Sequence, residues 1–168
     1  KFLVPAIRGD KVGTICMTEP NAGSDLDAMT TTAKEDGPYF ILNGTKTWIT
    51  SAPVADFFTV FAVTGEKKEL SIFLVERGTP GLIVGKSIEK MGLWASLTSE
   101  VIFDGCKIHK SHLLGDKNQG KEYLREILAK IRLTTAALAL GVGEIALEDA
   151  TRYANERVQF GKPIGKFQ

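Results

Sequence analysis

The sequence predicts an antiparallel β domain, a barrel or sandwich, followed by a long α-helix from a helical bundle, so that the chain is α+β overall. Two patterns support this fold class. Between about residues 12 and 114, runs rich in Val, Ile, Phe and Thr recur roughly every eight to twelve residues, with Gly or Pro between them. From about residue 120 to 158, apolar residues follow the i, i+3, i+4 spacing of a helix.

Each predicted strand is a short apolar or β-branched run bounded by turn residues. The runs cover residues 12–17, 29–33, 39–42, 45–50, 57–64, 70–76, 82–88 and 100–104. Asn43-Gly44 lies between two of them and predicts a hairpin with a type I′ turn, because both residue types tolerate positive φ. That hairpin would carry Trp48 and Thr50 on its second strand.

The helical pattern includes Leu124, Ile127, Leu128 and Ile131. One or two helices of about 35 residues in total would be about 50 Å long. Phe160-Gly161-Lys162-Pro163 predicts the end of the helix, with Gly at the C-terminal cap and Pro where a helix cannot continue.

We place a β domain at residues 1–117 and the start of an incomplete helical domain at residues 118–168. The sequence opens without an initiator Met and stops directly after a turn. We therefore expect a fragment of a longer protein or an excised domain.

The composition argues against several classes of function. Lys and Arg number 21 against 20 Asp and Glu, so there is no electrostatic footprint for nucleic acid or an anionic membrane. The longest apolar stretch, residues 136–142, is too short to span a bilayer. Two cysteines, Cys16 and Cys106, do not make a disulfide framework, which favours a reducing cytosolic setting.

Three further patterns carry no function. Residues 141–146 match the G-x-G-x-x-A dinucleotide pattern, but they lie inside the predicted helix and no strand precedes them. His109 and His112 lack a nearby third ligand, so we predict no metal site. No nucleophilic triad can be built from two histidines and two cysteines.

The string from Cys16 to Asp25, Cys-Met-Thr-Glu-Pro-Asn-Ala-Gly-Ser-Asp, is the most informative motif. It sets the Thr18 hydroxyl and a run of backbone N–H groups beside a strand end. These donors would suit the carbonyl and ring-nitrogen acceptors on the pyrimidine edge of a flavin. Alternatively, Pro20 to Asp25 is only a well-formed turn.

A second motif is Trp48-Ile49-Thr50. Strand alternation puts Trp48 and Thr50 on the same face, where they would offer a stacking surface and a hydrogen bond. A core Trp on a barrel strand is the alternative.

Arg157, at the end of the predicted helix, would clamp a pyrophosphate or merely complement the helix dipole.

These motifs, in this order, resemble segments of the acyl-CoA dehydrogenases. The chain looks like the middle β domain and the first long C-terminal helix of that family. The likeness covers nearly the whole chain. It also includes Leu42 to Thr50, Ala55-Asp56, Phe73 to Glu76, Lys90-Met91-Gly92, Leu114-Gly115 and Arg157 to Gly161.

The resemblance implies FAD as cofactor. Thr18 and the neighbouring backbone would meet the flavin pyrimidine edge, Trp48 would lie against the rings, and the Thr50 hydroxyl would approach N5. Arg157, Phe160 and Gln168 match positions that hold the adenosine diphosphate half, usually that of a neighbouring subunit. The full set of implied cofactor residues is Met17, Thr18, Gly23, Ser24, Trp48, Ile49, Thr50, Arg157, Phe160 and Gln168. Ser24 and Arg132 match positions near the CoA part of the substrate.

The resemblance further implies α,β-dehydrogenation of an acyl-CoA thioester, with electrons passed to an electron-transfer flavoprotein. The full-length protein would be a homodimer or homotetramer, located in the cytoplasm of a prokaryote or the mitochondrial matrix of a eukaryote. The family's usual catalytic Glu would lie beyond Gln168, so we expect no catalytic residue in this chain and an inactive fragment. Ile131 stands where some branches carry the base, and Ala129 stands where Asp is common.

Substrate length cannot be predicted, although residues 51–56 and Met29 faintly resemble the branch that handles glutaryl-CoA. Two other functions stay open. One is an acyl-CoA oxidase-like flavoenzyme that passes electrons to oxygen. The other is a non-catalytic module that binds flavin or CoA.

Overall fold

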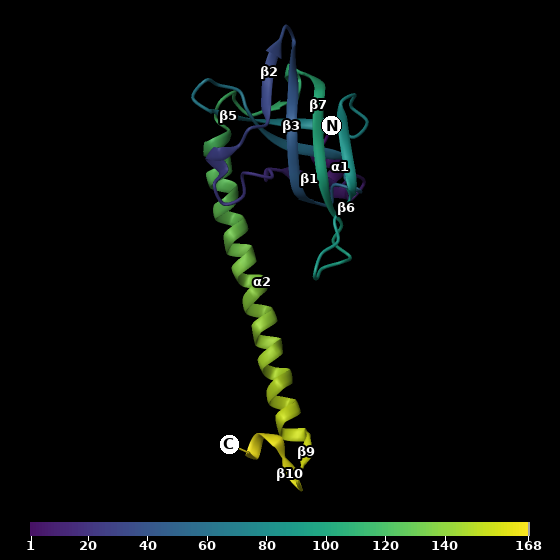
Figure 1. The fold of residues 1–168 in the computed structure, drawn as a ribbon, viewed down its shortest axis with the longest axis vertical. Helices are drawn as coiled ribbons and strands as arrows, with labels where there is room; N and C mark the ends of the chain where they lie inside the picture. The colour runs from purple at the N-terminus through teal and green to yellow at the C-terminus, as the bar shows by residue number, and fades with distance from the viewer. Residues whose placement is uncertain (168) are drawn as a thin grey trace. The chain divides into compact units, whose positions relative to one another are not determined.

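The computed structural model describes residues 1–167, and the chain separates into two compact units. The β unit, Lys1–Glu122, contains the large sheet, and the helical unit begins at Tyr123. The helices and strands are α1 (Leu3–Arg8), β1 (Gly13–Cys16), β2 (Thr32–Asp36), β3 (Tyr39–Thr50), β4 (Phe57–Val63), β5 (Leu70–Glu76), β6 (Leu82–Ser87), β7 (Thr98–His109), β8 (Leu113–Leu114), α2 (Gly120–Glu156), β9 (Val158–Gln159) and β10 (Lys162–Pro163) (Figure 1). The predicted β domain followed by a long helix is confirmed.

The β unit is one sheet with the strand order β6-β7-β3-β2-β4-β5-β8, and β1 pairs with β4. Within the described residues, β1 and β2 pair in parallel with β4, and the other pairings are antiparallel. The rings of Phe40 on β3 and Phe73 on β5 lie 4.9 Å apart, centroid to centroid. In a flat sheet, three strand spacings of about 4.8 Å would separate these strands. The sheet therefore curls around a shared core.

That core draws buried residues from β1, β2, β3, β4, β5 and β7. Alternate residues of β3 and β7 face it, as expected for strands with one exposed face. β4 is buried along most of its length, because five of its seven side chains are inaccessible.

The predicted hairpin turn at Asn43-Gly44 is wrong. β3 runs unbroken through these residues, and the turn between β2 and β3 lies at Gly37-Pro38. Gly44 instead occupies an irregularity in the pairing of β3 with β7, with φ of +147°. A Cβ at this position would lie 2.7 Å from the Thr31 Cα atom, so only glycine fits. The Asn-Gly signal therefore marks a close backbone approach.

The helical unit consists of most of α2 and a small C-terminal hairpin. α2 ends at Glu156, so the prediction of a C-terminal cap at Gly161 is wrong. β9 and β10 pair after it, and Phe160-Gly161 forms the turn between them, with φ of 50° and 74°. Positive φ at both turn residues is typical of the type I′ turn that was expected elsewhere. No described helix is long and apolar enough to cross a membrane.

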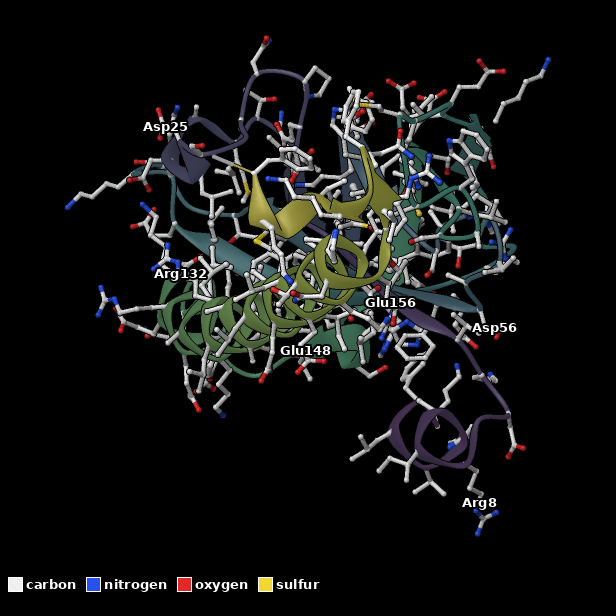
Figure 2. All side chains as sticks on the ribbon, turned by 90° about the horizontal axis from the view of Figure 1, so that it is seen from below. Arg8, Asp25, Asp56, Arg132, Glu148 and Glu156 are labelled. Atoms are coloured by element: carbon white, nitrogen blue, oxygen red, sulfur yellow. The ribbon has the colours of Figure 1, made fainter. Side chains whose placement is uncertain are left out.

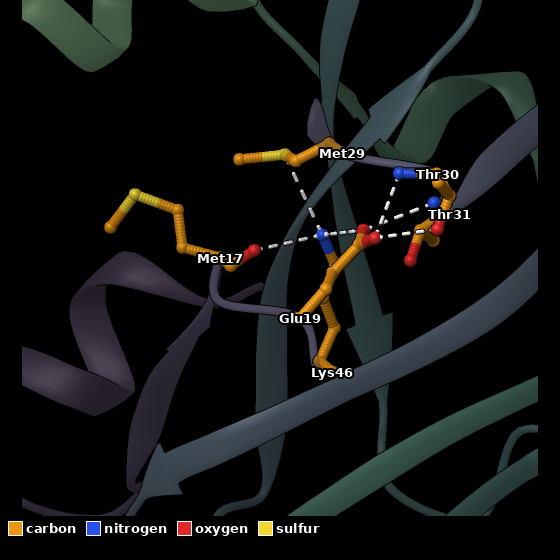
Figure 3. A network of polar contacts seen from close by, with 6 residues as sticks. All are labelled: Met17, Glu19, Met29, Thr30, Thr31 and Lys46. Carbon is orange, nitrogen blue, oxygen red and sulfur yellow. Dashed lines mark hydrogen bonds and ion pairs between the residues drawn. The ribbon is translucent and has the colours of Figure 1, made fainter. Parts of the chain in front are cut away.

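A buried ion pair joins β3 to the segment after β1 (Figure 3). The Lys46 Nζ atom lies 2.9 Å from Glu19 Oε1, and the two side chains are 0% and 3% exposed. The same Nζ donates to the Met17 carbonyl at 3.0 Å and lies 3.7 Å from Met29 Sδ. The three N–H donors of this ammonium thus have three acceptors.

The Glu19 carboxylate is equally well satisfied. Oε2 accepts hydrogen bonds from the Thr30 amide and hydroxyl, both at 2.7 Å, and Oε1 accepts from the Thr31 amide at 3.0 Å. Burial, the largest influence, would raise the pKa of Glu19. The hydrogen bonds from Thr31, Lys46 and Thr30 and the charge of Lys46 together outweigh it and lower the pKa to about 2. Burial lowers the pKa of Lys46 despite its anionic partner.

Replacing Gly44 by alanine should destabilise the β unit. The new methyl group would clash with Thr31, and overpacking of this kind costs about 2 kcal/mol. Chemical denaturation would measure this as a lower free energy of unfolding. Gly85→Ala is the matched control on β6, since its nearest neighbour would be 3.5 Å away, and it should stay within about 0.5 kcal/mol of the parent. An equal loss in both variants would contradict the close-approach explanation.

Acid should destabilise the protein through Glu19. Its pKa is about 2 when folded against 4.5 for an ordinary glutamate, so between these pH values the unfolded chain binds the proton and the folded chain does not. About 3 kcal/mol of stability should be present above pH 4.5 and lost as the pH falls toward 2. Denaturation across this pH range in Glu19→Gln should show a correspondingly flatter dependence.

High salt provides the control for this measurement. Glu35 also has a pKa lowered to about 2, by Lys110 and Lys117, but that carboxylate is exposed and its interactions are screened by salt. The Glu19 contribution should persist at 1 M salt. A pH dependence that disappears there would show that exposed pairs cause it.

Candidate functional site

The segment after β1 is held against β3 by its backbone. The Thr47 amide donates to the Thr18 carbonyl at 2.9 Å, and Lys46 bonds the Met17 carbonyl. The chain then closes a tight turn, in which the amides of Glu19 and Ala22 each donate to the carbonyl of the other at 3.0 and 3.1 Å. The turn that the sequence predicted in this motif thus begins one residue before Pro20.

Trp48 owes its position to a bulge in β3. The pairing with β7 shifts between Lys46 and Ile49, and Trp48 has φ of 58°. Left-handed backbone is rare for a bulky residue and is found where the surrounding structure enforces it, often at functional sites. Beyond the bulge, Trp48 is 56% exposed, Ile49 is buried, and Thr50 is exposed. Trp48 and Thr50 therefore share the outer face, and Ile49 has only its backbone to offer a ligand.

The structure brings the two sequence motifs together. The Thr47–Thr18 hydrogen bond puts Thr18 beside the residue that precedes Trp48. On the other side, the Thr14 hydroxyl of β1 donates to the Thr50 carbonyl at 2.5 Å. The Trp48 indole and the hydroxyls of Thr18 and Thr50 thus come from segments about 30 residues apart in sequence.

The hydrogen-bond donors of this region are available for a ligand. Among residues 1–167, the hydroxyls of Thr18, Ser24 and Thr50 have no hydrogen-bonding partner, and neither do the amides of Thr18, Gly23 and Ser24. The carboxylate of the adjoining Asp25 is already occupied, because it accepts a hydrogen bond from the Asp27 amide. An aromatic face beside unpaired donors is the chemistry needed to hold a planar ring system rich in acceptors, so these residues fit a flavin.

The loop that follows Thr50 is rigidly braced by Arg77, a residue to which the sequence reasoning assigned no role. The Arg77 guanidinium donates to the carbonyls of Ala55 and Ala52, the latter at 2.6 Å. Asp56 exchanges hydrogen bonds with the Val12 backbone, at 2.7 and 2.8 Å. The site is therefore built on fixed elements, as binding sites require.

Neither cysteine is available as a nucleophile. Burial raises the pKa of Cys16 to about 12, although the charge of Lys46 opposes this, and burial raises the pKa of Cys106 to about 11. Both thiols stay protonated at neutral pH, and only a thiolate would be reactive. No group of three His, Cys, Asp or Glu side chains within the described chain could hold a metal ion.

The helical unit contains the other predicted site residues. Arg132 is exposed and extends away from α2 (Figure 2). Arg157 directly follows the helix, and its carbonyl accepts from the Ile164 amide at 2.8 Å, while Phe160 is 94% exposed at the tip of the β9–β10 turn. Arg157 lies 25 residues after Arg132, and all but the last of these residues belong to α2, so at a rise of 1.5 Å per residue the two arginines are about 37 Å apart. They cannot serve the same local site of one subunit. Gln168 lies outside the described residues.

Glu19 and Lys46 lie within the motifs described from the sequence, but the sequence alone assigns them no function. The alternation of residues in the sequence pointed the wrong way. Lys46 stands in the predicted strand 45–50, at an even-numbered position with Trp48 and Thr50, so simple alternation would place it on the outer face with them. The bulge reverses this, and Lys46 faces the core.

Comparisons with known proteins identify the family of the chain. Residues 14–106 match the family model described as "Acyl-CoA dehydrogenase, middle domain", and residues 118–168 match "Acyl-CoA dehydrogenase, C-terminal domain". The chain is 60% identical to benzylmalonyl-CoA dehydrogenase of Aromatoleum aromaticum and 44% identical to 3-(aryl)acrylate reductase of Clostridium sporogenes. Each match covers 100% of this chain and 45% of the relative.

A solved structure shows the same fold. Butyryl-CoA dehydrogenase from Megasphaera elsdenii matches with a TM-score of 0.93 and 42% identity, over 99% of this chain and 45% of that one. The chain thus spans less than half the length of these relatives. The match to the middle-domain model alone covers more than half of the 168 residues, and the chain therefore belongs to the acyl-CoA dehydrogenase family.

Proposed function

We propose that the protein containing this chain is an FAD-dependent acyl-CoA dehydrogenase and that the β unit supplies the surface that faces the flavin. The observation that carries this proposal is the juxtaposition of Thr18 with Trp48 and Thr50 through the Thr47–Thr18 hydrogen bond. Family membership supports it. Bound FAD would supply the hydride acceptor for α,β-dehydrogenation of an acyl-CoA thioester.

The proposed cofactor-binding residues of the β unit have distinct roles. The Thr18 amide and hydroxyl bind the pyrimidine edge of the flavin, and the Trp48 ring packs against its face. The Thr50 hydroxyl donates a hydrogen bond near N5. Backbone at Met17, Gly23 and Ile49 completes the binding surface, and the exposed Ser24 hydroxyl reaches both the cofactor and the CoA arm.

The helical unit would serve another subunit. Arg157, Phe160 and Gln168 would hold the adenosine diphosphate half of a neighbour's FAD, which makes the protein a homodimer or homotetramer. Phe160 is 94% exposed, so its ring is accessible to a partner subunit, as this role requires. Arg132 would contact CoA on its own, since its distance from Arg157 excludes a shared local site.

No residue of this chain is proposed as the catalytic base. Ile131, at the position where some branches of the family carry it, cannot accept a proton. We therefore assign the chain to cofactor and substrate binding, with a β domain at 1–117 and part of a helical domain at 118–168.

The relatives suggest a substrate class. Benzylmalonyl-CoA dehydrogenase, with 60% identity, and 3-(aryl)acrylate reductase, with 44% identity, are both named for a compound that carries a benzyl or aryl group. We propose an acyl-CoA thioester with an aryl substituent near the carbons that are oxidised. Its electrons would pass to an electron-transfer flavoprotein.

Replacing Trp48 by alanine should weaken FAD binding about tenfold, because an aromatic contact on a flavin is worth on the order of 1 kcal/mol beyond its buried area. Flavin fluorescence titration of apoprotein expressed from the complete reading frame would measure the dissociation constant. Tyr39→Ala is the matched control, since Tyr39 lies at the opposite end of β3, roughly 30 Å away. Unchanged affinity in Trp48→Ala would refute the role of Trp48.

An activity panel would test the substrate and the electron acceptor. The complete protein should oxidise benzylmalonyl-CoA with a kcat/KM at least about tenfold above those for butyryl-CoA and glutaryl-CoA, since contact with one ring is worth more than 1 kcal/mol. Reduction of an electron-transfer flavoprotein should exceed peroxide formation. Dominant peroxide release would instead identify an oxidase, and equal rates on all three thioesters would contradict the aryl assignment.

A further inference from the structure

Lys46 is an unusual residue for the interior of a β unit. Its side chain is fully buried, and a buried ion pair rarely stabilises a fold more than apolar residues of the same volume would. The pair with Glu19 therefore suggests a function beyond stability. The contacts of the ammonium connect it to the backbone of the segment after β1.

Lys46 determines which way the peptide bond between Met17 and Thr18 faces. The Nζ atom holds the Met17 carbonyl at 3.0 Å, on the core side of the segment (Figure 3). A trans peptide is planar, with its C=O and N–H pointing in opposite directions. Because the Met17 carbonyl points to the buried ammonium, the Thr18 N–H must point away from it. That N–H has no partner within the described chain.

The next peptide is fixed as well. The Thr18 carbonyl accepts from the Thr47 amide at 2.9 Å, so neighbouring residues of β3 bind two consecutive carbonyls. Glu19 anchors the ammonium in turn, because Thr30 and Thr31 hold its carboxylate. Little freedom remains for the Thr18 backbone.

We infer that Lys46 is a positioning residue for the cofactor: by binding the Met17 carbonyl and the Glu19 carboxylate, it aims the Thr18 N–H at the pyrimidine edge of the flavin. This inference rests on the proposed function, since it requires FAD beside Thr18. Lys46 itself does not touch the cofactor. Its effect passes through one rigid peptide plane.

The test replaces the ion pair with a neutral pair, Lys46→Met with Glu19→Gln, in the protein from the complete reading frame. Two quantities are measured: the FAD dissociation constant of the apoprotein, and hydrogen exchange of the Thr18 amide with and without FAD. In the parent protein, FAD should slow exchange at Thr18. In the neutral-pair variant, FAD should bind about tenfold more weakly, the value of one well-oriented hydrogen bond, and the protection should disappear.

Met29→Leu is the matched control. It removes the sulfur that lies 3.7 Å from Nζ, keeps the side-chain volume, and leaves both carbonyl contacts intact. Its FAD affinity and Thr18 protection should equal those of the parent. A neutral-pair variant that kept both properties would overturn the inference.

The failure of the proposed function would look different. In that case, FAD would not slow exchange at Thr18 even in the parent protein, and Trp48→Ala would bind FAD normally.

If the neutral-pair variant does not fold, Lys46→Gln replaces it. This shorter neutral side chain retains a donor toward Glu19, and the same loss of affinity and of Thr18 protection is expected. Parent-like values would again overturn the inference.

Discussion

The contact between Lys46 and Glu19 is the interaction on which the candidate site depends. It joins three stretches of chain that no regular hydrogen-bond ladder connects: the segment after β1, the approach to β2, and the middle of β3. Charged groups in a low-dielectric interior tolerate few arrangements, because each unpaired donor or acceptor costs more there than in water. The network therefore selects one conformation of the loop that contains Thr18 and Ser24.

The bulge in β3 is the second constraint on the candidate site. It allows Lys46 to reach Glu19 in the interior while Trp48 stays on the outer face. Without it, simple alternation would place Lys46 and Trp48 on the same face of the strand. The shift between Lys46 and Ile49 turns the lysine inward and leaves the indole outside. A single strand thus provides both the internal support for the proposed binding surface and part of that surface itself. The braced loop after Thr50 completes this arrangement at the end of the strand.

Local sequence signals predicted some features and missed others for physical reasons. The strands predicted at 57–64 and 70–76 agree with β4 and β5 within one residue, because apolar runs of this kind form strands wherever they find a partner. The Asn43-Gly44 signal failed because long-range pairing with β7 and the approach to Thr31 decided the backbone there. The ion pair between Lys46 and Glu19 joins residues 27 positions apart, and the periodicity of the sequence cannot predict such a contact. The roles of Thr18, Trp48 and Arg157 stay predictions.

The length of α2 constrains how this protein can evolve. α2 is a single uninterrupted helix, and Arg132 lies on it while Arg157 follows directly after its last residue. Inserting one residue between them would turn one arginine by about 100° about the axis relative to the other and lengthen the separation by about 1.5 Å. The helix therefore fixes both the distance and the angle between Arg132 and Arg157. Over this stretch, substitutions that preserve the helix should accumulate freely, whereas insertions and deletions should be eliminated by selection.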